Sequence, residues 1–238
     1  MNEQQRSSSL ILGAALVIAA FVFGMFFYLS RAQDRTIRTT GLATQSIESD
    51  VIKWRITLTR TAAASAMRTG YTQVKEDLQS LLHQLEQAGV KREDINIQPV
   101  NPQAVYSGTG VISNYQIQQQ PLFIASSNVG AVETVALNPA SIVERGGILQ
   151  FSSIEYFSTR LPELKRALLG EATDDAKRRA EGIAQVSGLK VGRLMSARAG
   201  VFQITEPYSA EVGGMGMYNT STKKKDVSVT VNAVYEVQ

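Results

Sequence analysis

Few side chains in this sequence could carry out chemistry. It contains no cysteine and one histidine, His83. Without cysteine there can be no disulfide, no thiolate metal site and no cysteine nucleophile. A Ser-His-Asp triad would have to be built around His83, and a zinc site made only of imidazoles cannot be built. His83 falls opposite Leu78 and Leu85 on a stretch with helical periodicity, which predicts an exposed side chain.

Two further groups resemble chemical sites, and simpler interpretations account for both. The glycine-rich stretch Gly213–Gly216 lacks the lysine-serine pattern of a phosphate loop and opens no predicted helix, so we interpret it as loop. The second group mixes charges on one predicted helix: Glu171, Asp174, Asp175, Lys177, Arg178 and Arg179. Pairs three and four residues apart predict a charged, solvated face. We therefore assign no catalytic, cofactor-binding or metal-binding residue, and we predict that the chain is not an enzyme and needs no cofactor.

A run of twenty residues, Leu10–Leu29, contains no charged side chain and no proline. A helix of that length is about 30 Å long, the thickness of the hydrocarbon core of a bilayer. A cleaved signal has a shorter apolar stretch, of about 7 to 15 residues. We therefore predict an uncleaved transmembrane helix at 10–29, preceded by a tail at 1–9 and followed by a connector at 30–35.

The charges beside this run leave its orientation open. The tail carries Arg6, whereas the segment after the run carries Arg31, Arg35 and Arg38. Counted alone, these arginines would place the large domain in the cytoplasm, but long domains cross a membrane largely regardless of nearby charge.

The overall charge argues against a nucleic-acid partner. The formal net charge is +3, and the one basic run, Lys223–Lys225, is short and follows a stretch rich in glycine, serine and threonine. A nucleic-acid footprint is a larger basic patch or stripe. We interpret this run as a solvated loop.

The remaining chain, residues 36–238, predicts an α+β domain with helices packed on antiparallel or mixed sheets. Apolar and β-prone residues predict strands at 36–46, 51–61, 95–100, 148–159, 193–203 and 227–237, and residues 115–125 are also predicted to be extended. Three- and four-residue periodicity predicts helices at 65–87, 128–137 and 161–187. The first two strands are expected to form a hairpin, and Pro121 is expected at an edge or a bulge. Two polar, turn-rich stretches, at about 101–114 and 204–226, are predicted to be flexible loops.

Several segments resemble the SIMPL-domain family. Residues 175–197, DAKRRAEGIAQVSGLKVGRLMSA, are similar to its signature of a basic, alanine-spaced helix that ends at glycine and leads into a strand. Thr40–Leu58, Leu85–Val100 and the closing VSVTVNAVYEV resemble further parts of the family. FSTRLPELKRALLGEATDDAKRRAE resembles its membrane-anchored bacterial branch. The likeness extends over 36–238.

The resemblance implies a protein of the bacterial envelope, with a cytoplasmic N-terminus and the large domain outside the cytoplasmic membrane. The family has no established catalytic residues, members can assemble into large homo-oligomeric rings, and some are linked to stress tolerance. We therefore predict a single-pass, non-enzymatic protein, held by Leu10–Leu29, that self-assembles into a ring or channel-like scaffold. The alternative is an envelope binding module that captures a ligand or a protein partner through its two long loops.

Overall fold

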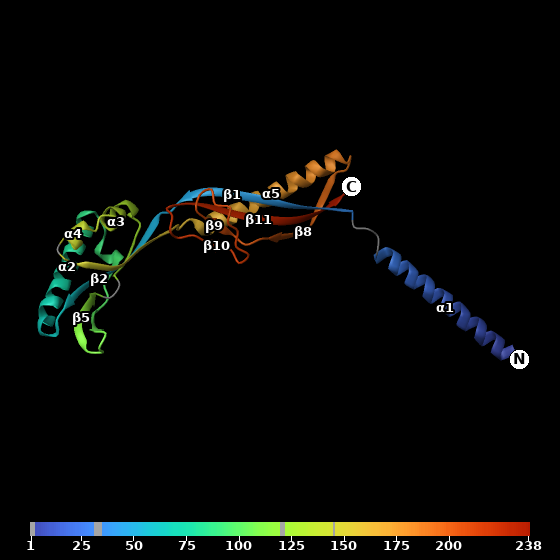
Figure 1. Ribbon diagram of the computed structural model, residues 1–238. Coiled ribbons are helices and arrows are strands. Elements are labelled where there is room, and N and C mark those ends of the chain that lie inside the picture. The colour runs from blue at the N-terminus through green and yellow to red at the C-terminus, as the bar shows by residue number, and fades with distance from the viewer. Residues whose placement is uncertain (1–2, 31–34, 120–121, 145) are drawn as a thin grey trace.

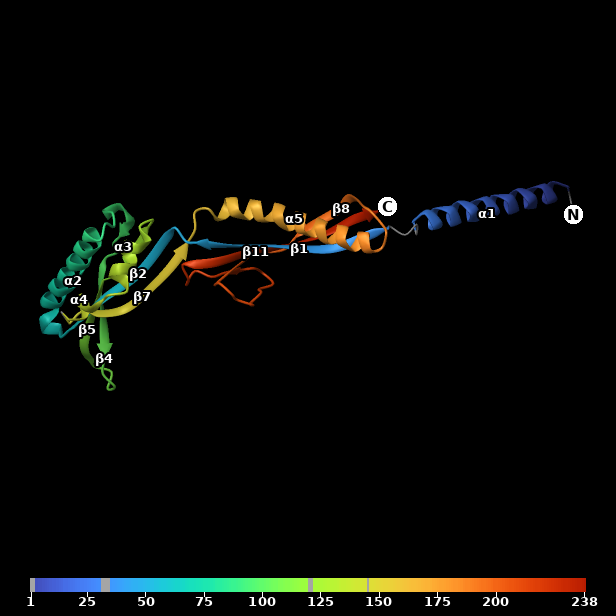
Figure 2. The ribbon, with the colours of Figure 1, turned by 90° about the horizontal axis from the view of Figure 1, so that it is seen from above.

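The computed structural model describes residues 3–30, 35–119, 122–144 and 146–238. Figures 1 and 2 show an elongated molecule in which a long helix, α1 (Glu3–Ser30), stands apart from two lobes. Each lobe consists of its own β-sheet with helices on one face. We call them the proximal lobe, residues 36–49 and 158–238, and the distal lobe, residues 50–157.

The proximal lobe is a five-stranded sheet covered by one long helix. Its elements are β1 (Thr36–Glu48), α5 (Leu161–Val186), β8 (Val191–Ala199), β9 (Gln203–Thr205), β10 (Met217–Tyr218) and β11 (Lys224–Val237). The central strand is β11, which runs antiparallel to β1 on one side and to β8 and β9 on the other. The pair β9–β10 is parallel, so the sheet is mixed.

The distal lobe is a six-stranded antiparallel sheet covered by three helices. Its strands are β2 (Val51–Ala62), β3 (Ile95–Asn96), β4 (Val100–Tyr106), β5 (Ile112–Gln119), β6 (Leu122–Ser126) and β7 (Ile148–Phe157). Its helices are α2 (Met67–Gln87), α3 (Val129–Ala136) and α4 (Ala140–Val143). The strand order is β3-β6-β2-β5-β4, with β7 on the other side of β2. The two lobes together confirm the predicted α+β class.

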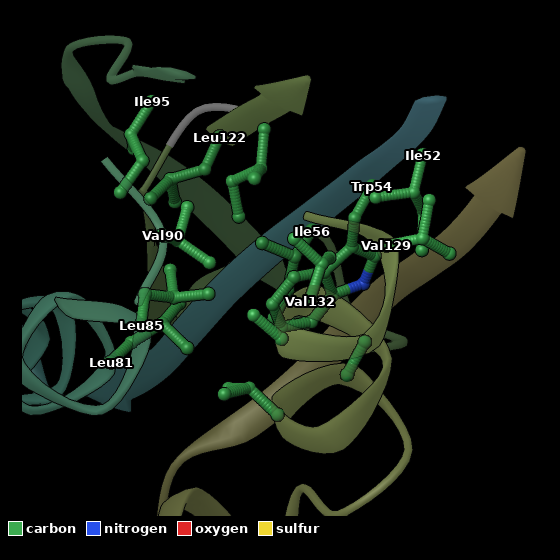
Figure 3. Packing of buried hydrophobic residues seen from close by; sticks show 14 of the residues in the cluster. Ile52, Trp54, Ile56, Leu81, Leu85, Val90, Ile95, Leu122, Val129 and Val132 are labelled. Carbon is green, nitrogen blue, oxygen red and sulfur yellow. The ribbon is translucent and has the colours of Figure 1, made fainter. Parts of the chain in front are cut away.

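The distal core follows from the alternation in β2. Ile52, Trp54 and Ile56 are at most 2% exposed and face the helices. They pack in one cluster with Leu85 of α2 and Val132 of α3 (Figure 3). Burying each such side chain stabilises the fold by about 1.5–3 kcal/mol. The indole N–H of Trp54 does not lose its partner on burial, since it donates to Ser152 Oγ at 2.9 Å.

The proximal core depends on small residues that let α5 approach the sheet closely. Four alanines, spaced one helical turn apart, are at most 1% exposed: Ala172, Ala176, Ala180 and Ala184. Gly41 of β1 lies directly beneath them, and a Cβ added to it would overlap Ala172 O and Ala176 N. The neighbouring Thr39 donates its hydroxyl to Ala176 O at 2.8 Å. Helix and strand therefore meet backbone to backbone.

The expected hairpin between the first two strands is wrong, although both strands exist. β1 pairs with β11, whereas β2 pairs with β5, β6 and β7. The chain crosses between the sheets at Ser49–Asp50, where Ser49 N donates to Lys223 O at 2.9 Å and Asp50 N to Phe157 O at 3.0 Å. Strands from later in the chain supply the partners, so these sequence neighbours do not pair.

The expected strand at 95–100 and loop at 101–114 are also wrong in their bounds. Ile95–Asn96 form β3, residues 97–99 are not in a strand, and β4 runs from Val100 through Pro102 to Tyr106 as a hairpin with β5. Proline has no N–H to donate, but β4 lies at the edge of the sheet, where that donor is not needed. Pro121 lies outside the described residues.

Helix α1 contains the whole of the predicted run at 10–29. Side chains are described for residues 13–27, and the apolar ones are exposed, with Leu16 at 68%, Phe21 at 72% and Phe26 at 71%. A search of the described residues finds no helix that is both long enough and apolar enough to cross a membrane. Of the predicted tail and connector, residues 1–2 and 31–34 lie outside the described residues.

The substitution Gly41→Ala should separate α5 from the sheet, because the new Cβ would overlap the helix backbone. We expect the free energy of unfolding to fall by about 1–3 kcal/mol in urea titrations. The matched control is Gly170→Ala within α5, where an added Cβ meets nothing within 4 Å. This control should stabilise the fold by about 0.5–1 kcal/mol. Equal effects of the two substitutions would contradict the close contact.

Candidate functional site

The residues that could have carried out chemistry are not gathered into one site. His83 is exposed, as predicted, and its Nε2 lies 2.9 Å from the amide nitrogen of Gln87 on the same helix. Among the described residues, no three histidine, aspartate or glutamate side chains are grouped so that they could hold a metal ion.

Asp175 differs from the prediction of a solvated face, because its carboxylate contacts the backbone of a neighbouring strand. Its Oδ2 accepts the backbone N–H of Leu42 in β1 at 2.9 Å and the Nε–H of Arg179 at 2.8 Å. The hydrogen bond from Leu42 is the main cause that holds the pKa of Asp175 below its ordinary value. Asp175 therefore covers the middle of the outer edge of β1, where a backbone donor would otherwise be free.

The opposite edge of this part of the sheet, β8, is open. Gly200 N donates to Thr230 O at 2.8 Å, and Arg198 lies opposite Asn232 in the same ladder. Because ladder bonds alternate along an antiparallel strand, Ala197 and Ala199 direct their N–H and C=O groups away from β11. Residues 193–199 are all exposed, and in the described part of the chain β11 is the only strand that pairs with β8. Such an edge can pair with a strand of another chain.

Apolar side chains surround this open edge. On β8 itself Leu194 and Met195 are 46% and 47% exposed, and at the end of α5 Ile183 and Val186 are 51% and 91% exposed. The two elements are in contact and lie side by side in Figure 2. We call β8 with these α5 residues the β8 edge. It combines unpaired backbone groups with apolar area, as strand-pairing interfaces do.

A groove of about 460 Å³ lies on the face of the proximal sheet that α5 does not cover. It is lined by Arg38, Ser196, Ala197, Arg198, Asn232 and Val234. The register explains its composition: Arg38 lies beside Val234, and Arg198 beside Asn232, so the two arginines occupy the strands on either side of β11. We call it the arginine groove.

The polar side chains that line the groove can all donate hydrogen bonds. Within the described residues, neither Arg38 nor Arg198 has a carboxylate within 4.0 Å. Asn232 accepts the hydroxyl of Thr40 through its Oδ1 at 2.6 Å, which leaves an amide nitrogen that can only donate. The neighbouring Glu236 is already paired with Arg193, at 3.1 Å. Sequence analysis missed this site because Arg38 lies more than a hundred positions before the other lining residues.

The interpretation of Lys223–Lys225 as a solvated loop is wrong. β11 begins at Lys224, and its alternation turns Lys225 inward, where it is 1% exposed. Lys225 Nζ donates to Asn219 O at 2.7 Å and to Thr222 O, and burial lowers its pKa. The predicted flexible loop at 204–226 is therefore shorter and is tied to the sheet.

The same segment joins the two lobes. Lys223 Nζ lies 3.2 Å from Glu48 in the proximal lobe and 3.6 Å from Glu133 in the distal lobe. Glu133 also accepts the hydroxyl of Tyr156 at 2.8 Å; burial, followed by this bond, raises the pKa of Tyr156 to about 12. Asp50 accepts both the N–H and the hydroxyl of Thr159 across the second chain crossing. Polar contacts thus fix the joint between the lobes.

One exposed surface remains in the region of the second predicted loop. Tyr208 is fully exposed and has a φ of 63°, and Met215 is 98% exposed. The loop around them is held by Gln203, which donates through Nε2 to Gly213 O at 2.8 Å and accepts Gly213 N–H at 3.2 Å. A bulky residue with positive φ is strained, so the fold holds Tyr208 outward at a cost in energy.

Lys223→Met should loosen the joint, because Lys223 pairs with a carboxylate of each lobe. The chain has no cysteine, so cysteines introduced at Gln79 and Glu171, one in each lobe, can be labelled selectively with spin labels. We expect a broader distribution of label-to-label distances by pulsed electron paramagnetic resonance. Lys224→Met, at the neighbouring exposed position, should leave the distribution unchanged. Similar broadening in both variants would show that Lys223 does not hold the joint.

Comparison with known proteins identifies the family to which this chain belongs. The model of the SIMPL family, described as a protein of unknown function (DUF541), matches residues 37–235, which cover both lobes. No curated protein matches the chain. A crystal structure of a hydrolase from Listeria innocua aligns with 88% of this chain and 98% of its own, at 10% identity and a TM-score of 0.20, a value too low to carry an argument. Since the family match covers most of the sequence, the chain belongs to the SIMPL family.

Proposed function

We propose that this SIMPL-family chain is a membrane-anchored protein of the bacterial envelope that assembles with copies of itself and is not an enzyme. The observation that carries the proposal is the β8 edge, with its outward backbone groups and exposed Leu194 and Met195. An unpaired strand with apolar side chains gains hydrogen bonds and buried area when a second chain covers it. A link to stress tolerance stays a prediction from the family resemblance.

The proposed anchor is α1. Its uncharged run at 10–29 has the length of a bilayer core, and its described apolar side chains are exposed all around the helix. Lipid would cover that surface, and the helix satisfies its own backbone hydrogen bonds. We propose that the N-terminus is cytoplasmic and that both lobes lie outside the membrane.

The two edges of the proximal sheet offer different surfaces to a second copy. Asp175 blocks the middle of the β1 edge, whereas the β8 edge is free, so the two edges of one copy are not equivalent. A ring needs a contact between unlike surfaces that repeats from copy to copy and closes when the rotation allows it. We therefore propose that the β8 edge of one copy meets a surface of the next copy other than its β8 edge. In the described part of the chain, His83 contacts the amide nitrogen of Gln87, which supports our proposal of a scaffold and not an enzyme.

The anchor can be tested with paired substitutions in α1. Carbonate washing should leave the full chain in the membrane fraction, and added protease should reach the lobes only from the outer side. Val17→Arg with Phe21→Arg should release the protein, because each arginine near the bilayer centre costs about 2.5–3.5 kcal/mol. Val17→Leu with Phe21→Leu is the matched control. Release of the unsubstituted chain by carbonate would contradict the anchor.

The assembly can be tested at one backbone group. Ala197→Pro removes an N–H that points away from β11, so the strand can stay in its own sheet while losing a donor for a neighbouring chain. We expect the detergent-extracted protein to shift to monomers in light-scattering measurements of mass. Ala197→Ser keeps the N–H and should keep the assembly. An unchanged mass in Ala197→Pro would rule out pairing through this edge.

A binding module is the second candidate, and the strained, exposed Tyr208 favours it. In that case the loop that carries Tyr208 and Met215 contacts a protein partner. Tyr208→Ser with Met215→Ser should then abolish crosslinking to that partner in cells and leave the mass of the extracted protein unchanged. Crosslinking that is the same with and without these substitutions would remove this candidate.

A further inference from the structure

The arginine groove contains two arginine side chains that pairing of copies through the β8 edge would not involve. The edge directs backbone groups sideways out of the sheet, whereas the groove opens on the sheet face opposite α5. Its two arginines are exposed and, in the described residues, have no carboxylate partner in ion-pair range. Two uncompensated cations side by side repel each other unless an anion lies between them.

The strand geometry lets both arginines reach one anion. Arg38 and Arg198 lie on strands two apart and in adjacent rows, with Val234 and Asn232 between them. With about 4.8 Å between strands, their Cα atoms are roughly 12 Å apart, a span that two extended arginine side chains bridge. The guanidinium groups can therefore converge above β11.

The remaining donors complete a set that suits a tetrahedral oxyanion. Asn232 offers an amide nitrogen, because Thr40 occupies its oxygen, and Ser196 offers a hydroxyl from β8. These donors come from both sides of the groove and from its floor. A carboxylate presents two oxygens in one plane, whereas a phosphate presents several in different directions and carries up to two charges, so it can satisfy more of them.

We propose that the arginine groove is a phosphate-binding site. The phosphate can come from two sources. One is a soluble phosphate, and the other is the headgroup of an anionic lipid. Arg38 lies only three residues from Arg35, whose carbonyl accepts Val237 N–H at the end of the sheet that is nearer to α1 in the sequence. The lipid source rests on the proposed membrane anchor, but the phosphate site itself does not.

The test is calorimetric titration of the full chain in nonionic detergent with inorganic phosphate, at constant ionic strength. We expect saturable binding that weakens about tenfold in Arg38→Gln and about tenfold in Arg198→Gln, since a charge-assisted hydrogen bond contributes about that factor. Acetate should bind more weakly than phosphate. The matched control is Arg193→Gln, also on β8, whose arginine is paired with Glu236 and does not line the groove.

The outcomes test the phosphate site independently of the proposed anchor and the proposed assembly. No phosphate binding in detergent, or equal losses in Arg193→Gln and Arg198→Gln, overturns the site. Repeating the titration in lipid discs then identifies the source. If phosphatidylglycerol discs weaken phosphate binding and phosphatidylcholine discs do not, the headgroup occupies the groove; if both give the affinity found in detergent, the ligand is soluble. Light scattering on the Arg38→Gln and Arg198→Gln variants should show an unchanged mass, so a loss of binding does not reflect loss of assembly.

Discussion

The close contact between α5 and β1 determines which surfaces of this protein are free. Because Gly41 and the four buried alanines bring the helix backbone onto the strand, α5 is centred over β1 and β11. The helix therefore contacts β8 without covering its outer edge, and it covers only one face of the sheet. The exposed edge and the arginine groove both follow from this placement. A bulkier helix face would stand higher above the sheet and lose the hydrogen bond from Leu42 to Asp175.

The two lobes differ in what they contribute: the distal lobe has the larger hydrophobic core, and the proximal lobe has the candidate contact surfaces. The distal lobe carries the larger core, built on β2 with Trp54 at its centre, and the joint at Lys223 ties it to the rest. The β8 edge, the arginine groove and the strained loop at Tyr208 all belong to the proximal lobe, which also connects to α1 (Figure 1). In our account the proximal lobe makes the contacts near the membrane, and the distal lobe projects away from it.

Sequence patterns predicted elements better than they predicted partners. Alternation located β2 and β11, and helical periodicity located α2 and α5, because both patterns are local. The pairing of β1 with β11 joins residues nearly two hundred positions apart, and no local pattern shows it. For the same reason Lys225 was assigned to a loop and the arginine groove was missed. Only the register places Arg38 beside Val234 and Arg198 beside Asn232 on one face of the sheet.

The mass of the intact protein tests the central claim most directly. The full chain, extracted in mild detergent, can be weighed by mass photometry or native mass spectrometry across micromolar concentrations. Our account predicts one defined multiple of the 25.9 kDa chain, with a rotational symmetry visible in electron micrographs. A single-chain mass at every concentration would contradict it, and the β8 edge would then need a different explanation.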